Sequence, residues 1–135
     1  AGFVDTAAAI KGDEFKIAIS CIKEKLMYDI KEFTARSGQK ITVTFKNSDF
    51  PPHNLLFVKP GAADEVASQA IALGAEGFAK GFRPDSNKIL WGSSMLDHGQ
   101  QSTINFIAPE PGDYPYLCTF PGHHILMRGM MHVVK

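Results

Sequence analysis

The sequence predicts an all-β fold, a sandwich or barrel of seven or eight short strands with one helical excursion. Two observations carry this prediction. Short runs alternate apolar and polar residues, as strands with one buried face do. Gly, Pro, Asn and Asp, the residues typical of turns, lie between most of these runs. Many short strands separated by turn signals are typical of a β-sandwich or barrel.

The first two predicted strands have the clearest alternation. They lie in FKIAISC and in QKITVTFKN, where every second residue would face the core. These core-facing residues are Phe15, Ile17, Ile19, Cys21, Ile41, Val43 and Phe45. Further strands are predicted in HNLLFV, NKILW, QSTINFIA, DYPYLC and GMMHVV.

A helix is predicted at residues 62–73, in AADEVASQAIAL. Val66, Ala70 and Leu73 fall at helical spacing, and acidic residues in the first turn suit the positive end of the helix dipole. Gly74 can end the helix because glycine readily adopts the backbone conformation of a helix terminus.

Composition limits the domain count and the kinds of partner. The excursion from Lys59 to Asn87 is too short to bury its own core, so residues 1–135 are expected to form a single domain. The 14 basic and 14 acidic residues balance, which gives no general attraction to nucleic acid or to an anionic membrane. No apolar run approaches the roughly 18 residues of a spanning helix, so we expect a soluble, mature chain with no membrane insertion.

Metal-binding residue types are concentrated in YLCTFPGHHILMRGM, near the C-terminal end. Thiolate, imidazole and thioether groups all bind soft transition metals, and copper accepts all three. Cys118 is followed by His123 and then by Met127, with a Pro-Gly bend between the first two. The bend would let these three side chains converge on one metal ion.

A blue-copper site needs a second imidazole, because two histidines and a cysteine form its trigonal plane beside a weak axial methionine. His53, in NSDFPPHNLLFV, is the best candidate, since prolines fix its backbone where a loop enters a strand. The amide of Asn54 could reach the Cys118 loop and hold the two segments together. The predicted ligands of one copper ion are His53, Cys118, His123 and Met127.

Other roles are open to some of these residue types. A lone cysteine is more often a small buried hydrophobe than a ligand, so the copper prediction depends on the whole ligand set. Cys21 is interpreted as core packing rather than as half of an intermolecular disulfide, and His123 is preferred over His124 because of its spacing from Cys118. Packing is expected for Trp91, Phe78 and Phe82, core and surface positions for Met131 and Met130, and solvated or hydrogen-bonded roles for His98 and His132.

The order HN, a long excursion, then Y-x-C-T-F-P-G-H-x-x-x-M-x-G resembles the cupredoxins, and the azurins in particular. KGFRPDSNKIL and SMLDHGQQSTINF are similar in order and spacing to azurin segments as well. The resemblance implies a Greek-key β-sandwich with one type 1 copper ion held by the four predicted ligands. The chain departs from azurins in two ways: Pro52 replaces a glycine before the first histidine, and Cys21 has no partner for the N-terminal disulfide.

The resemblance also implies a function, an electron carrier that cycles between Cu(I) and Cu(II) and is not an enzyme. Multicopper oxidases flank this cysteine with histidines, whereas Leu117 and Thr119 flank Cys118 here, and a binuclear copper site would need two cysteines in one loop. Copper storage or delivery is the remaining alternative, which the methionine count permits. A blue oxidised form would favour the carrier over delivery.

The expected partners are redox proteins. They would dock on an apolar patch around Pro52, Phe120, Pro121 and His123, at the copper end of the molecule. We expect a monomer that works in the periplasm or is otherwise exported, because free copper is scarce in the cytosol.

Overall fold

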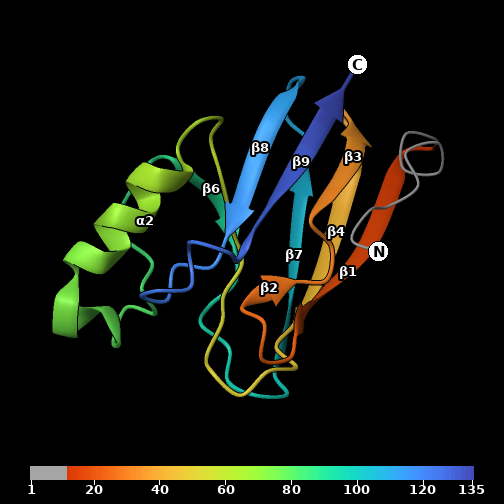
Figure 1. The fold of residues 1–135 in the computed structure, drawn as a ribbon. Coiled ribbons are helices and arrows are strands. Elements are labelled where there is room, and N and C mark those ends of the chain that lie inside the picture. Colours follow the sequence, from red (N-terminus) through yellow and green to blue (C-terminus); the bar gives the residue numbers. More distant parts are fainter. Residues whose placement is uncertain (1–11) are drawn as a thin grey trace.

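Two β-sheets face each other in the structure, a computed structural model that describes residues 12–135 (Figure 1). One sheet has the order β2 (Met27–Tyr28), β1 (Glu14–Ile22), β4 (Lys40–Lys46) and β7 (Gln101–Ile107). The other has the order β3 (Glu32–Arg36), β9 (Arg128–Val134), β8 (Gly112–Leu117), β5 (Leu56–Val58) and β6 (Ile89–Gly92). Neighbouring strands in each sheet are mostly not consecutive in sequence. The predicted all-β, Greek-key sandwich is confirmed.

Both sheets mix parallel and antiparallel pairs. β1 runs parallel to β4, with Ile17 opposite Val43, and β4 runs antiparallel to β7. In the second sheet β3 is parallel to β9, while β8 is antiparallel to both β9 and β5. The chain therefore crosses between the sheets, and the loops at the lower end of Figure 1 come from both.

The core lies between the sheets and contains the residues that alternation predicted. Ile41, Val43 and Phe45 are fully buried, while Ile19 and Cys21 are nearly so. Each such large apolar side chain contributes on the order of 1.5–3 kcal/mol when it leaves water. Aromatic rings fill the centre, and the fully buried ones are Tyr28, Phe33, Phe57 and Tyr116.

Two strands, β2 and β3, were not predicted from the sequence. β2 has only two residues, too few for any periodicity. In β3 the consecutive residues Phe33, Thr34 and Ala35 are all buried, so the strand has no exposed face and no alternation to detect.

The helical excursion packs outside the second sheet. Helix α2 (Ala63–Ala72) buries Val66 and Ala67 in a separate apolar cluster that includes Leu117 of β8. A short 3₁₀ turn, η1 (Gly74–Gly77), follows, and Gly74 has a φ of +58° where the α-helix has ended, as predicted. The helix thus supports the strand that leads directly to Cys118.

Among the three aromatic residues predicted to pack, Phe82 is 2% exposed and Trp91 is half-buried. The prediction for Phe78 is wrong, because its side chain is 72% exposed. The ring of Phe78 lies beside those of Phe82 and Phe120, with ring centroids 5.0 Å and 6.3 Å away.

The single domain expected over residues 1–135 stays a prediction, since residues 1–11 lie outside the described part of the chain. Within residues 12–135, no helix is long and apolar enough to cross a membrane.

Candidate metal centre

The segment from Cys118 to Met127, which we call the C-terminal loop, connects β8 to β9 and folds back on itself. The amide of Cys118 donates to the carbonyl of Met127 over 3.1 Å, and that of Met127 donates to the carbonyl of His123 over 3.0 Å. The amide of His123 closes a turn by donating to Phe120 O over 2.9 Å, and Gly122 within this turn has a φ of +86°. This tight loop brings the three predicted ligands of the motif to one place.

Backbone hydrogen bonds to a distant segment hold His53 in place. Its amide and carbonyl both pair with Leu96, over 3.1 Å and 2.9 Å. The side chain of Asn47 donates to the carbonyls of Pro51 and Leu96, which fixes the start of the same loop. The loop of residues 47–53, the His53 loop below, is therefore anchored to the chain that precedes β7.

Asn54 joins the two loops, as predicted. Its Nδ2 donates to Thr119 Oγ1 over 2.9 Å, and its Oδ1 accepts from the amide of Thr119 over 2.8 Å. Both residues are buried, and Thr119 Oγ1 in turn donates to Phe82 O. The residue after His53 and the residue after Cys118 are thus fixed relative to each other.

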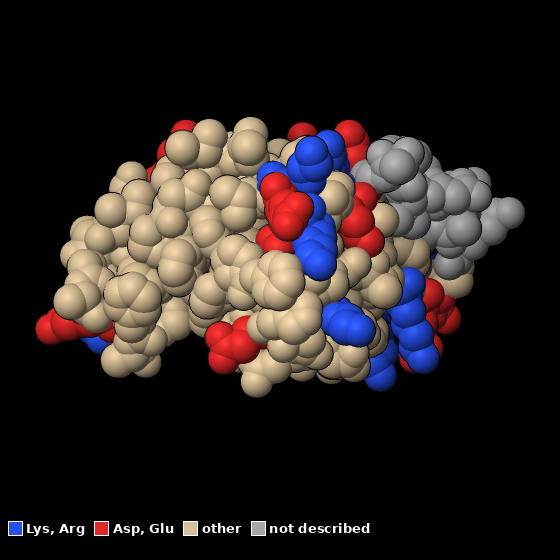
Figure 2. All heavy atoms as spheres, turned by 60° about the horizontal axis from the view of Figure 1, so that its bottom comes forward, with Lys and Arg blue, Asp and Glu red and all other residues tan. Residues whose placement is uncertain are grey.

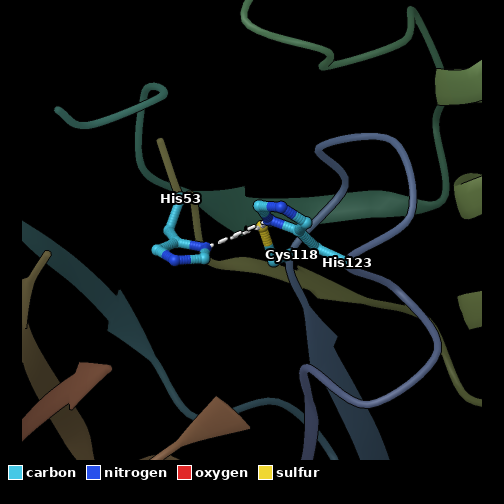
Figure 3. A group of neighbouring side chains, drawn as sticks. All are labelled: His53, Cys118 and His123. Carbon is cyan, nitrogen blue, oxygen red and sulfur yellow. Dashed lines mark hydrogen bonds between the residues drawn. The ribbon is translucent and has the colours of Figure 1, made fainter. Parts of the chain in front are cut away.

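Three donor atoms face one another in this frame (Figure 3). Cys118 Sγ lies 3.7 Å from Nδ1 of His53 and 3.7 Å from Nδ1 of His123, and the two nitrogens are 3.2 Å apart. The centre of this triangle is about 2 Å from each corner, close to the ~2.0–2.1 Å of a zinc–imidazole bond and slightly under the ~2.3 Å of a zinc–thiolate bond. All three side chains are buried.

The protonation states also favour a cation at this position. The Asp49 carboxylate, which can only accept when ionised, lies 3.0 Å from His53 Nε2, so Nε2 carries the proton and the Nδ1 lone pair faces the triangle. Burial, opposed by Asp49, lowers the pKa of His53, while burial and the neighbouring His53 lower the pKa of His123 to about 4. Neutral imidazoles are the form that binds metal.

The Cys118 thiol would lose its proton only when a metal ion binds. Burial raises the pKa of its thiol to about 11, although hydrogen bonds from the backbone of Asn54 and Phe120 oppose this shift. A metal ion bound here would be held by the thiolate form of Cys118, with the thiol proton displaced. The donor set of two imidazoles and one thiolate fits a soft transition metal such as copper.

Three further candidate residues, Met127, His124 and Cys21, are not part of the triangle of donor atoms. Met127 is fully buried in the core cluster that contains Cys118. His124 is half-buried and outside the three-residue cluster. Cys21 is a free, buried thiol on the core face of β1, as predicted.

The hydrogen-bonded roles expected for two histidines are confirmed. His98 Nδ1 lies 2.9 Å from the carbonyl of Asp49, and the His132 ring contacts carboxylates of Asp113 and Glu32. In β9, Met131 is fully buried and Met130 is half-buried, as expected.

Sequence reasoning did not identify Asp49. The signal was an acidic residue four positions before a ligand histidine, in a loop stiffened by two prolines. That spacing does not show whether the acidic side chain is buried. The burial of Asp49, which makes it important, is visible only in the structure.

The chain belongs to the copper-binding proteins of the plastocyanin/azurin family, whose pattern it matches over residues 15–134. It is thus a copper-binding cupredoxin, and proteins of this class are electron carriers rather than enzymes. Auracyanin-A of Chloroflexus aurantiacus is 38% identical over 119 residues, which are 87% of this chain and 73% of that protein. Auracyanin-B of the same organism is 36% identical over 85 residues, 60% of this chain but only 35% of that longer protein.

Solved structures agree with this assignment. Dithionite-reduced auracyanin from the photosynthetic bacterium Roseiflexus castenholzii superposes with a TM-score of 0.82 at 42% identity, covering 89% of this chain and 97% of that one. Auracyanin A of Chloroflexus aurantiacus, described as a "blue" copper protein, gives a TM-score of 0.80 at 33% identity over 90% and 99% of the two chains.

Proposed function

We propose that this protein carries single electrons on one type 1 copper ion, which cycles between Cu(I) and Cu(II) as redox partners donate and accept. His53, Cys118 and His123 supply the trigonal plane, and Met127 is the weak axial ligand. The observation that supports this most is the triangle of two imidazole nitrogens and one sulfur, whose centre suits a metal ion.

The rigidity of the site suits electron transfer. The ligand side chains are buried, and hydrogen bonds fix both loops and the Asn54 link between them. A frame that does not rearrange between oxidation states keeps the barrier to electron transfer low. Copper, when bound, supplies the one-electron couple, and the chain supplies the fixed geometry and the exclusion of water.

Voltammetry on protein loaded with one equivalent of copper tests this function. We expect a reversible one-electron couple with a stoichiometry of one copper per chain. Irreversible loss of copper on reduction would instead support a delivery protein and contradict the carrier.

Partners are proposed to dock on apolar surface at the copper end. His123 is 7% exposed, and its ring lies 4.7 Å from that of Phe120. In addition to the patch predicted from sequence, Phe78, Ile125 and Leu126 are each at least 60% exposed. Figure 2, in which the lower end of Figure 1 comes forward, shows a broad face with few charged side chains on the α2 side.

This surface suits a partner that presents an apolar patch of its own. A groove of about 320 Å³ lies within it, and its lining is apolar except for one acidic residue: Pro52, Phe78, Gly81, Phe82, Met95, Phe120 and Asp97. An apolar face can approach the His123 edge without stripping water from charges, which keeps a small and transient contact possible.

A charge placed on the surface tests the docking site. Leu126→Glu or Pro121→Glu should slow electron self-exchange or exchange with a partner at least about tenfold, if the blue colour is retained. Ile107→Glu is the matched control, because Ile107 is 59% exposed on β7 at the end where it pairs with Lys40, away from the His53 loop. Equal slowing by the control, or a strong salt dependence with no effect of the loop variants, would contradict apolar docking.

We also propose that the protein works as a monomer outside the cytoplasm. Among its relatives, Outer membrane protein H.8 of Neisseria gonorrhoeae is 24% identical over 119 residues, 82% of this chain. Cell fractionation with an antibody to the protein tests the location, and sedimentation tests the oligomeric state.

A further inference from the structure

A buried acid, Asp49, lies directly behind one proposed ligand. Its side chain is 1% exposed, and its Oδ2 lies 3.0 Å from His53 Nε2, on the side of the ring opposite the donor triangle. Its Oδ1 accepts from the amide of Phe50 over 2.9 Å and from the amide of Glu24 over 3.2 Å. The carboxylate is therefore held in place from three directions.

Within residues 12–135, no Lys or Arg side chain forms an ion pair with this carboxylate. Acidic residues are almost never fully buried unless they are paired with a positive charge. Among residues 12–135 the only ion pair of Asp49 is with the His53 imidazole, which is neutral when it binds a metal. The positive charge that would balance Asp49 is the metal ion on the other side of the ring.

We propose that Asp49 is a positioning residue of the copper site that also sets its reduction potential. It holds His53 in the tautomer with the proton on Nε2, so that Nδ1 points into the triangle, and its negative charge favours Cu(II) over Cu(I). This inference rests on the proposed function.

Counting charges gives the direction of the effect. Thiolate and carboxylate together contribute two negative charges, which balance Cu(II) but exceed the charge of Cu(I). Because the site is buried, solvent and salt screen this excess only weakly, so the reduced form is disfavoured. Removing the carboxylate charge should therefore favour reduction.

Asp49→Asn removes the charge and keeps the shape of the side chain. Its single amide oxygen can accept either from His53 Nε2 or from the amides of Phe50 and Glu24, but not from both sides. We expect this variant to remain blue and to lower the Cu(II) to Cu(I) ratio at a fixed solution potential at least about tenfold, which is a rise of about 59 mV. Asp113→Asn is the matched control, because Asp113 lies 2.7 Å from Nδ1 of a half-buried histidine that is not a proposed ligand, His132. A potential in Asp49→Asn equal to that of the parent and the control would overturn the electrostatic role.

The tautomer is measured without copper. In metal-free protein, ¹⁵N NMR should show His53 in the single tautomer with the proton on Nε2, and Asp49→Ala should give a mixture of both tautomers. An unchanged tautomer in Asp49→Ala would overturn the positioning role. If Asp49→Ala does not fold, Asp49→Asn still decides the electrostatic role. Should the parent protein fail to form a blue site at all, the proposed function fails, while the NMR result still decides whether Asp49 orients His53.

Discussion

Replacing Asn54 with alanine should destabilise the protein and loosen the copper site together. Asn54, which directly follows the His53 loop, is fully buried and makes two hydrogen bonds to Thr119 of the C-terminal loop. The alanine variant leaves the buried amide of Thr119 without a partner, which costs about 1–3 kcal/mol. Loss of the bond to Thr119 Oγ1 adds about 1 kcal/mol, since this hydroxyl keeps Phe82 O as an acceptor.

The expected loss is therefore about 2–4 kcal/mol, measured by urea unfolding of metal-free parent and variant proteins. Copper affinity should also fall, roughly 10–100-fold, because the loops that carry the ligands are no longer tied together. Asn105→Ala is the control: Asn105 also pairs with a threonine, Thr42, but on an exposed face, so its loss should cost less than about 0.5 kcal/mol. A free energy of unfolding for Asn54→Ala within 1 kcal/mol of the parent would refute this reasoning.

Three further predictions concern the axial ligand, the metal and pH. Met127→Leu should stay blue and raise the reduction potential, while Met127→Gln should lower it; unchanged potentials in voltammetry would exclude Met127 as a ligand. Free copper at 100 times its dissociation constant should stabilise the fold by about 2.7 kcal/mol, and a melting curve that copper does not shift would argue against a preformed site. A hydrogen bond to Asp113, aided by Glu32, raises the pKa of His132 above its usual 6.5 although partial burial opposes this. The resulting stability, under about 1 kcal/mol because the pair is partly exposed, is fully present below pH 6.5 and is lost as pH rises through the folded-state pKa. Unfolding of parent and Asp113→Asn at pH 5.5 and 8.5 measures this, and an equal difference between the two proteins at both pH values would contradict it.

Alternation and ligand spacing made much of this protein predictable. β1 and β4 each have one face toward the core, so the alternation of apolar residues along them predicted both strands. The predicted ligands of the C-terminal loop are close in sequence, and one turn brings them together. His53 could be proposed because blue-copper chemistry requires a second imidazole.

The features that escaped prediction depend on contacts distant in sequence. β3 is buried by strands from the other end of the chain, so its residues carry no local pattern. Nothing in the local sequence distinguishes Asp49 from other acidic loop residues, because its burial behind His53 depends on the whole fold. Phe78 was expected to pack, but the excursion leaves it exposed beside Phe120.

The visible absorption spectrum of the protein with one equivalent of Cu(II) tests the central claim most directly. The chain has two cysteines, both buried and free, and only Cys118 lies in the donor triangle. The parent and Cys21→Ser should both be intensely blue from thiolate-to-Cu(II) charge transfer, and Cys118→Ser should lose this band because a neutral hydroxyl cannot replace the thiolate. A colourless copper complex of the parent, or a blue band that survives in Cys118→Ser, would contradict a type 1 copper site at this position.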